Sequence, residues 1–194
     1  MDKLDNWEAV WSPYTDDIYQ AALAMLCPDD VVLDIGAGDL RFSRLAASKV
    51  RRVTAIEQNR DLLGTAPIAH NLTAIGADAR IWNFPNGISV AVLLMRHCTC
   101  FAHYVAKLRG VGCGRLITNA RWRTGVECVS LAPKPTLQTM SEMGSKAGWY
   151  ACLCGATGFV AATPEGVTPE ALNRTLEVEG CPRCVRDSTT LRKT

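Results

Sequence analysis

The sequence lacks any apolar run that approaches the roughly 20 residues needed to cross a membrane, and residues 1–6 contain no apolar core of a signal peptide. Its formal net charge is only +2, too small to indicate a nucleic-acid partner by itself. We therefore expect a cytoplasmic protein without a membrane segment. The 194 residues, 48% hydrophobic and 21% charged, suit a globular domain with an appendage rather than a disordered chain.

A glycine-rich turn is the most informative stretch of the sequence. Residues 31–35, Val-Val-Leu-Asp-Ile, form an apolar run typical of a buried parallel strand. Gly36 and Gly38 follow, and glycines there allow a tight turn that brings backbone N–H groups close to a ligand. About twenty residues later, Glu57 ends a second apolar run, a spacing that suits a carboxylate holding ribose hydroxyls. NAD, FAD and S-adenosylmethionine (SAM) all fit this pattern.

The residues around the turn favour SAM over a dinucleotide. Arg41 replaces the third glycine of the dinucleotide pattern, and Asp34 and Asp39 place negative charge where a pyrophosphate would bind. SAM carries a sulfonium and an ammonium but no phosphate. Residues 34–41, together with Glu57, resemble the first two motifs of the Rossmann-like (class I) SAM-dependent methyltransferases. A dinucleotide site and a purely structural turn remain alternatives.

This resemblance implies a set of cofactor-binding residues. Asp78 follows the predicted third strand, where an Asp in these enzymes accepts a hydrogen bond from the adenine amine; a solvated turn residue is the alternative. Tyr14 and Thr15 precede the first strand, where such residues can contact the methionine end of SAM; packing and helix capping are the alternatives. The expected cofactor-binding residues are Asp34, Gly36, Ala37, Gly38, Glu57, Gln58, Asp78, Ala79, Tyr14 and Thr15.

The order of apolar segments predicts a doubly wound, mostly parallel α/β sheet. Strand-like and helix-like stretches alternate from residue 31 to residue 119, after a helical preamble in residues 1–30, and residues 126–131 are a candidate edge strand. Pro133 and Pro135 break any continuing element. We therefore predict a SAM-binding domain in residues 1–132 and a second module in residues 133–194.

The candidate catalytic residues are Arg96 and His97. They follow the predicted fourth strand directly, where many methyltransferases place groups that face the substrate. Neither the Asn-Pro-Pro-Tyr signature of amino-group methylation nor the Pro-Cys nucleophile of cytosine-C5 enzymes occurs there. His97 is the only one of three histidines expected at a strand end, so we predict that His97 contacts the substrate and that Arg96 anchors an anionic group.

The second module carries four of the nine cysteines, in two close pairs: Cys152 with Cys154, and Cys181 with Cys184. Four thiolates satisfy a tetrahedral Zn²⁺ completely and leave no open position, so we predict a structural zinc. The arrangement resembles a zinc ribbon, although its first pair is spaced Cys-x-Cys. A rubredoxin-like iron site and a redox dithiol are alternatives. The module either completes the fold or grips the substrate through cationic residues, with help from Arg121, Trp122 and Arg123.

These features together indicate a SAM-dependent methyltransferase. The predicted sheet has few insertions that could form a lid over a small molecule, so we expect a macromolecular acceptor, either an RNA base or a protein amine. A non-catalytic adaptor that binds SAM or uses the zinc ribbon to recruit a partner is the alternative from another class, and an NAD-linked oxidoreductase is a third. The oligomeric state is not indicated by the sequence.

Overall fold

The structure is a computed structural model that describes residues 14–64, 69–96, 98–121, 125–132, 138–139, 147–161 and 163–184. Its contacts divide the chain into two units. The sheet unit comprises the described residues of 1–95, 107–119 and 126–132, and the cysteine unit comprises those of 96–106, 120–125 and 133–194. The boundary after residue 132 stays a prediction. The contacts also group two inner segments, the described residues of 96–106 and 120–125, with the C-terminal residues.

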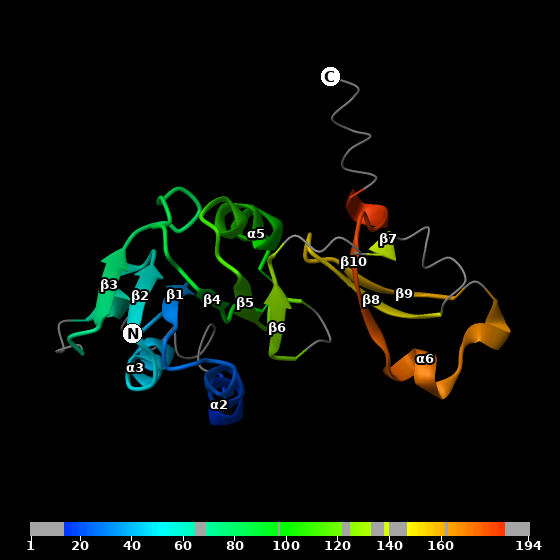
Figure 1. The fold of residues 1–194 in the computed structure, drawn as a ribbon, viewed down its shortest axis with the longest axis horizontal. Helices are drawn as coiled ribbons and strands as arrows, with labels where there is room; N and C mark the ends of the chain where they lie inside the picture. Colours follow the sequence, from blue (N-terminus) through cyan, green and yellow to red (C-terminus); the bar gives the residue numbers. More distant parts are fainter. Residues whose placement is uncertain are drawn as a thin grey trace, which may run out of the picture. The chain divides into compact units, whose positions relative to one another are not determined.

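The sheet unit contains a six-stranded sheet with the order β3-β2-β1-β4-β5-β6 (Figure 1). Strands β1 to β5 are parallel, whereas β6 is antiparallel to β5. The strands are β1 (Val31–Ile35), β2 (Arg52–Glu57), β3 (Leu72–Gly76), β4 (Val90–Leu93), β5 (Arg115–Thr118) and β6 (Glu127–Ser130). The predicted fold class, including the candidate edge strand, is therefore confirmed.

Helices precede and connect these strands: α2 (Asp16–Ala24), α3 (Arg41–Ala47), α4 (Arg60–Leu63) and α5 (Phe101–Gly110). One face of the sheet packs with α2 and α3, through Val32, Val53 and Val90 on the strands and Ala22 and Phe42 on the helices. Residues that alternate with these along the strands, such as Leu33 and Ala91, are also fully buried. Both faces of the central strands are covered, which explains why the strand sequences are continuously apolar.

A partly buried ion pair between Asp30 and Arg115 fixes the end of the sheet at which β1 begins. Asp30 accepts hydrogen bonds from Arg115 at 2.8 Å on both carboxylate oxygens, from Ser89 Oγ and from the Cys27 N–H. Burial opposes ionisation, but these donors outweigh it and lower the pKa of Asp30. Since this cluster occupies the end where the strands start, the opposite, carboxyl end is where a ligand site is expected.

The cysteine unit has a four-stranded sheet with the order β7-β10-β8-β9. Its elements are β7 (Gln138–Thr139), β8 (Gly148–Cys152), β9 (Thr157–Val160), the 3-10 turn η1 (Pro164–Gly166), α6 (Pro169–Asn173) and β10 (Thr175–Glu179). Strands β8 and β9 form an antiparallel hairpin, and β10 runs parallel to β8 with Val178 beside Cys152. Because the two parallel strands end together, the cysteines that follow them meet at one end of the sheet.

Among the described residues, the structure has no helix that is both long enough and apolar enough to span a membrane.

Candidate functional site

The glycine turn joins β1 to α3 at the carboxyl end of the sheet. Gly36 and Gly38 have positive φ angles of 74° and 55°. The N–H groups of Gly36 and Ala37 both donate to the Ile56 carbonyl, at 2.9 and 3.0 Å, so the turn stays attached to β2. A Cβ on Gly36 would lie 2.6 Å from Met95 Cε, which places the Met95 side chain directly against this glycine.

Leu40 ends the turn in a strained conformation. Its φ of 68° lies in the left-handed region, which costs a non-glycine residue about 1–2 kcal/mol. The side chain is fully buried in the core and the Leu40 N–H donates to the Ala37 carbonyl at 3.0 Å, so packing holds the conformation. Strain of this kind is concentrated at binding and catalytic sites.

Glu57 connects the turn to the end of β2. Its Oε2 accepts a hydrogen bond from the Gly38 N–H at 2.9 Å, and its Oε1 accepts one from the Asn59 N–H at 2.8 Å. A carboxylate has about four acceptor positions, so two remain for ligand hydroxyls. The neighbouring Gln58 is exposed. The structure therefore brings Glu57 and the glycine turn together, as the spacing predicts.

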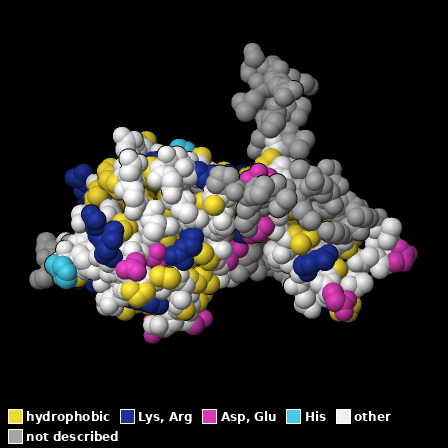
Figure 2. All heavy atoms as spheres, in the orientation of Figure 1, with side chains coloured by type: hydrophobic (Ala, Val, Ile, Leu, Met, Phe, Trp, Pro, Cys, Tyr) yellow, Lys and Arg dark blue, Asp and Glu magenta, His cyan; other side chains and the backbone are white. Residues whose placement is uncertain are grey.

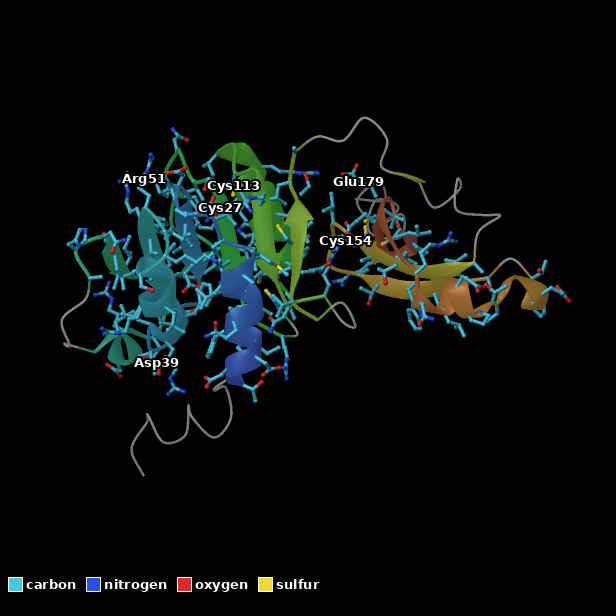
Figure 3. All side chains as sticks on the ribbon, turned by 60° about the horizontal axis from the view of Figure 1, so that its bottom comes forward. Cys27, Asp39, Arg51, Cys113, Cys154 and Glu179 are labelled. Atoms are coloured by element: carbon cyan, nitrogen blue, oxygen red, sulfur yellow. The ribbon has the colours of Figure 1, made fainter. Side chains whose placement is uncertain are left out.

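The two aspartates of the motif contribute less net negative charge at the turn than two unpaired, ionised carboxylates would. Asp34 is 3% exposed, and burial, together with the nearby charge of Glu57, raises its pKa to about 7. The Ser43 hydroxyl donates to Asp34 Oδ2 and acts in the opposite direction. Asp39, labelled in Figure 3, forms an ion pair with Arg41. Asp34 thus ties β1 to α3.

Asp78 and Ala79 lie in the loop that follows β3. The Arg80 guanidinium donates to both oxygens of Asp78, and these hydrogen bonds lower the Asp78 pKa to about 2. An adenine amine would therefore share a carboxylate that already has a cationic partner.

Lys107, on α5, holds this loop in shape, a role that no sequence pattern predicted. Its Nζ donates to the carbonyls of Ala79, Trp82 and Arg80 at 2.6, 2.7 and 3.1 Å. The ammonium also lies 4.2 Å from the centre of the Phe84 ring. Since three backbone carbonyls depend on one side chain, Lys107 fixes the backbone on either side of Arg80. Lys107 and Ala79 are 28 residues apart in sequence, so this contact depends on the tertiary fold and has no local sequence signal.

The remaining predicted residues are placed as follows. Tyr14 is half-buried, with its ring 6.2 Å from the ring of Tyr19. Thr15 is exposed at the N-terminus of α2, and its side chain makes no capping hydrogen bond. Arg96 is exposed and belongs to the cysteine unit, and His97 lies outside the described residues. Roles for these four residues stay predictions.

The four predicted metal ligands form one cluster in the cysteine unit (Figure 3). Their sulfur atoms all lie within 4.8 Å of one another. The sulfur atoms of Cys154 and Cys181 are 3.5 Å apart. The sulfur of Cys184 lies 3.8 Å from that of Cys152 and 3.8 Å from that of Cys181. A tetrahedral ion with Zn–S bonds of about 2.3 Å requires sulfur–sulfur distances of about 3.8 Å. The cluster therefore has the size and donor set of a zinc site.

Two contacts bind the inner segments of the cysteine unit to this module. A Cβ on Gly155, in the first cysteine turn, would lie 3.1–3.3 Å from carbons of the buried Phe101 side chain. Arg121 is 1% exposed and its guanidinium pairs with both carboxylate oxygens of Glu177. The prediction that Arg121 offers charge to a substrate was wrong, because its charge is buried and paired within the unit.

No protein-family model and no curated protein matches the chain. Among solved structures it is similar to a precorrin-8w decarboxylase from Methanobacterium thermoautotrophicum, with 24% identity over 57% of this chain and 65% of that one, at a TM-score of 0.48. It is similar to a SAM-dependent methyltransferase from Thiobacillus denitrificans in complex with S-adenosyl-L-homocysteine, with 18% identity over 61% of this chain and 55% of that one, at a TM-score of 0.48. It is also similar to a precorrin-6y C5,15-methyltransferase from Geobacter metallireducens, with 20% identity over 58% of this chain and 66% of that one, at a TM-score of 0.49. The chain thus spans less than two thirds of the length of each of these proteins.

Proposed function

We propose that this protein is a SAM-dependent methyltransferase whose cofactor binds at the carboxyl end of the six-stranded sheet. The observation that carries the proposal is the Glu57 carboxylate, which is held by the Gly38 N–H at 2.9 Å and keeps acceptor positions for two ribose hydroxyls. Gly36 supports it, because the Met95 methyl group lies where a side chain at position 36 would be, so only glycine fits this part of the turn.

Each part of the cofactor has a partner on the adjacent strands. Glu57, at the end of β2, would hold the ribose, and Asp78 with Ala79, beyond β3, would receive the adenine. The methionine end then extends past Gly36 toward β4, where Tyr14 and Thr15 are further proposed contacts. Gln58, which follows Glu57 at the end of β2, is a further proposed cofactor contact. When bound, SAM supplies an electrophilic methyl group to a nucleophilic atom of the substrate. The protein's contribution is to hold donor and acceptor in line and to exclude water.

Arg96 and His97 are the third and fourth residues after β4 in the sequence and remain the proposed substrate-facing residues. The acceptor is proposed to be a macromolecule, an RNA base or a protein amine, because the described parts of the connections between strands include no long lid. Figure 2 shows Lys and Arg side chains mixed with Asp and Glu on the visible face of the sheet unit, so charge there does not decide between the two.

The cysteine cluster is proposed to hold a structural Zn²⁺. Cys152, Cys154, Cys181 and Cys184 would supply four thiolates and leave no position open for a substrate. Among the described residues no two cysteines are joined by a disulfide, which agrees with the proposed cytoplasmic, reducing location. Metal binding would supply much of the folding free energy of this small unit.

Calorimetric titration with SAM and with NADH tests the proposal. We expect SAM to bind and NADH not to bind, and we expect Glu57→Ala to weaken SAM binding about 10- to 100-fold, since hydrogen bonds to a charged group contribute about 1.5–3 kcal/mol. Asp29→Ala is the matched control, because Asp29 is an exposed acid at the opposite end of β1. Tight NADH binding, or equal SAM binding by Glu57→Ala and the wild type, would refute the assignment. SAM binding without methyl transfer to any acceptor would favour the alternative, a non-catalytic adaptor that binds SAM.

A further inference from the structure

The side-chain amide of Asn119 is buried without a hydrogen-bond partner among the described residues. Asn119 is 8% exposed, and neither its Nδ2 nor its Oδ1 is paired. Other buried polar side chains of the sheet unit do have partners: Ser43 donates to Asp34, Thr118 donates to the Leu93 carbonyl at 2.8 Å, and Asp30 accepts from Arg115. A buried amide with no partner is costly to folding, so it requires an explanation.

Asn119 lies at the carboxyl end of the sheet, directly after β5. In the sheet, β4 lies between β1 and β5, and Leu93 pairs with Thr118. Met95, two residues after β4, lies against Gly36 of the turn. Glu57 and Asp78 follow β2 and β3, on the other side of β1. A cofactor with its ribose and adenine on that side directs its methyl group toward β4 and β5, where the unpaired amide lies.

We propose that Asn119 binds the methyl-accepting group, and that this group is a nucleobase of RNA. The inference rests on the proposed methyltransferase function. A carboxamide presents a carbonyl that accepts and an NH₂ group that donates, side by side. The edge of a nucleobase offers the complementary pair, as when an Asn side chain forms two hydrogen bonds with adenine. A lysine amine accepts a methyl group only when it is neutral, and its single lone pair then attacks the methyl carbon. No acceptor is left for the NH₂ group of Asn119, so half of the amide would stay unpaired.

This role predicts a variant that is more stable than the wild type but transfers the methyl group to its substrate more slowly. Asn119→Leu keeps the branched shape of the side chain and removes the unpaired amide, so we expect its melting temperature to rise by about 2–4 °C. We expect SAM affinity within about twofold of the wild type and transfer to RNA at least about tenfold slower, the effect of losing hydrogen bonds to the substrate. Asn119→Ala tests the same loss without a new branched side chain.

The experiment uses the zinc-loaded full chain, radiolabelled SAM, and two probes from cells that lack this protein: total RNA and total protein. Asn71→Leu is the matched control, because the Asn71 amide donates to the Ala47 and Val50 carbonyls at 2.9 and 3.1 Å and its loss should lower the melting temperature. Label in RNA that both Asn119 variants lose, with SAM binding retained, supports the proposal.

Four results would overturn it. Unchanged labelling of RNA by Asn119→Leu would remove the binding role, and a lower melting temperature of that variant would show that the amide has a stabilising partner. Label only in protein would exclude a nucleobase, and so would label in neither probe while SAM is bound. Failure of the wild type to bind SAM would instead refute the proposed function itself.

Discussion

The pKa of Asp34 predicts an unusual dependence of stability on pH. Its carboxyl has a pKa of about 7 in the folded protein, against 3.8 in the unfolded chain, because it is buried beside Glu57. The folded state therefore holds a proton that the unfolded state has lost at any pH between these values. Stability from this group is complete below about pH 4, falls as the pH rises, and is lost above about pH 7.

The magnitude follows from the difference of about 3 pKa units, which corresponds to about 4 kcal/mol at 1.36 kcal/mol per unit. Asp34→Asn removes the titration, and its Oδ1 still accepts from the Ser43 hydroxyl. Between about pH 4.5 and about pH 8.5, we expect the variant to gain about 3 kcal/mol of unfolding free energy relative to the wild type.

Urea unfolding at constant ionic strength measures this difference. Subtracting the unfolding free energy of one protein from that of the other cancels the contributions of groups that titrate in both. Ser43→Ala is the companion variant, because loss of its hydrogen bond should raise the Asp34 pKa further and shift the transition to higher pH. A difference between wild type and Asp34→Asn that stays flat over this pH range would refute the reasoning.

Three further predictions concern the turn, the loop and the metal. Gly36→Val should abolish SAM binding in calorimetry, because its φ of 74° disfavours a branched residue and its Cβ would lie 2.6 Å from Met95 Cε; unchanged affinity would exclude the turn as the cofactor site. Lys107→Met should weaken SAM binding about tenfold by releasing three carbonyls, with Lys49→Met, an exposed lysine bonded to one carbonyl, as control. Zinc removal by a chelator should raise hydrogen exchange in the cysteine unit, including the backbone around Phe101, and leave β1 protected; equal exchange with and without metal would refute a structural zinc.

Local sequence signals sufficed for much of the fold. The central strands of the large sheet are short apolar runs bounded by glycine, proline or polar residues, and residues buried on both faces leave a continuous apolar signature. The two cysteine pairs predicted one cluster because thiolates at such spacing have few other uses in a reducing compartment. The parallel pairing of β8 and β10, which brings the two pairs together, is a long-range contact that spacing does not encode.

The site was predictable only where its residues lie in one motif. Gly36, Gly38 and Glu57 are brought together by adjacent strands, as their spacing requires. Lys107 and Asn119 gave no signal, because their roles depend on partners, or on the lack of them, across the fold. Arg121 illustrates the limit: a cationic residue beside an aromatic one suggested a binding surface, whereas burial and Glu177 make it structural.

The most direct test of the central claim is transfer of the radiolabelled methyl group from SAM into a lysate of cells that lack this protein. The products are divided into RNase-sensitive, protease-sensitive and small-molecule fractions, with Glu57→Ala as the weakened variant and Asp29→Ala as the active control. At a SAM concentration near the wild-type dissociation constant, we predict label in a macromolecular fraction with the wild type and Asp29→Ala, and several-fold less with Glu57→Ala. No label in any fraction, while SAM is bound tightly, would contradict the methyltransferase function.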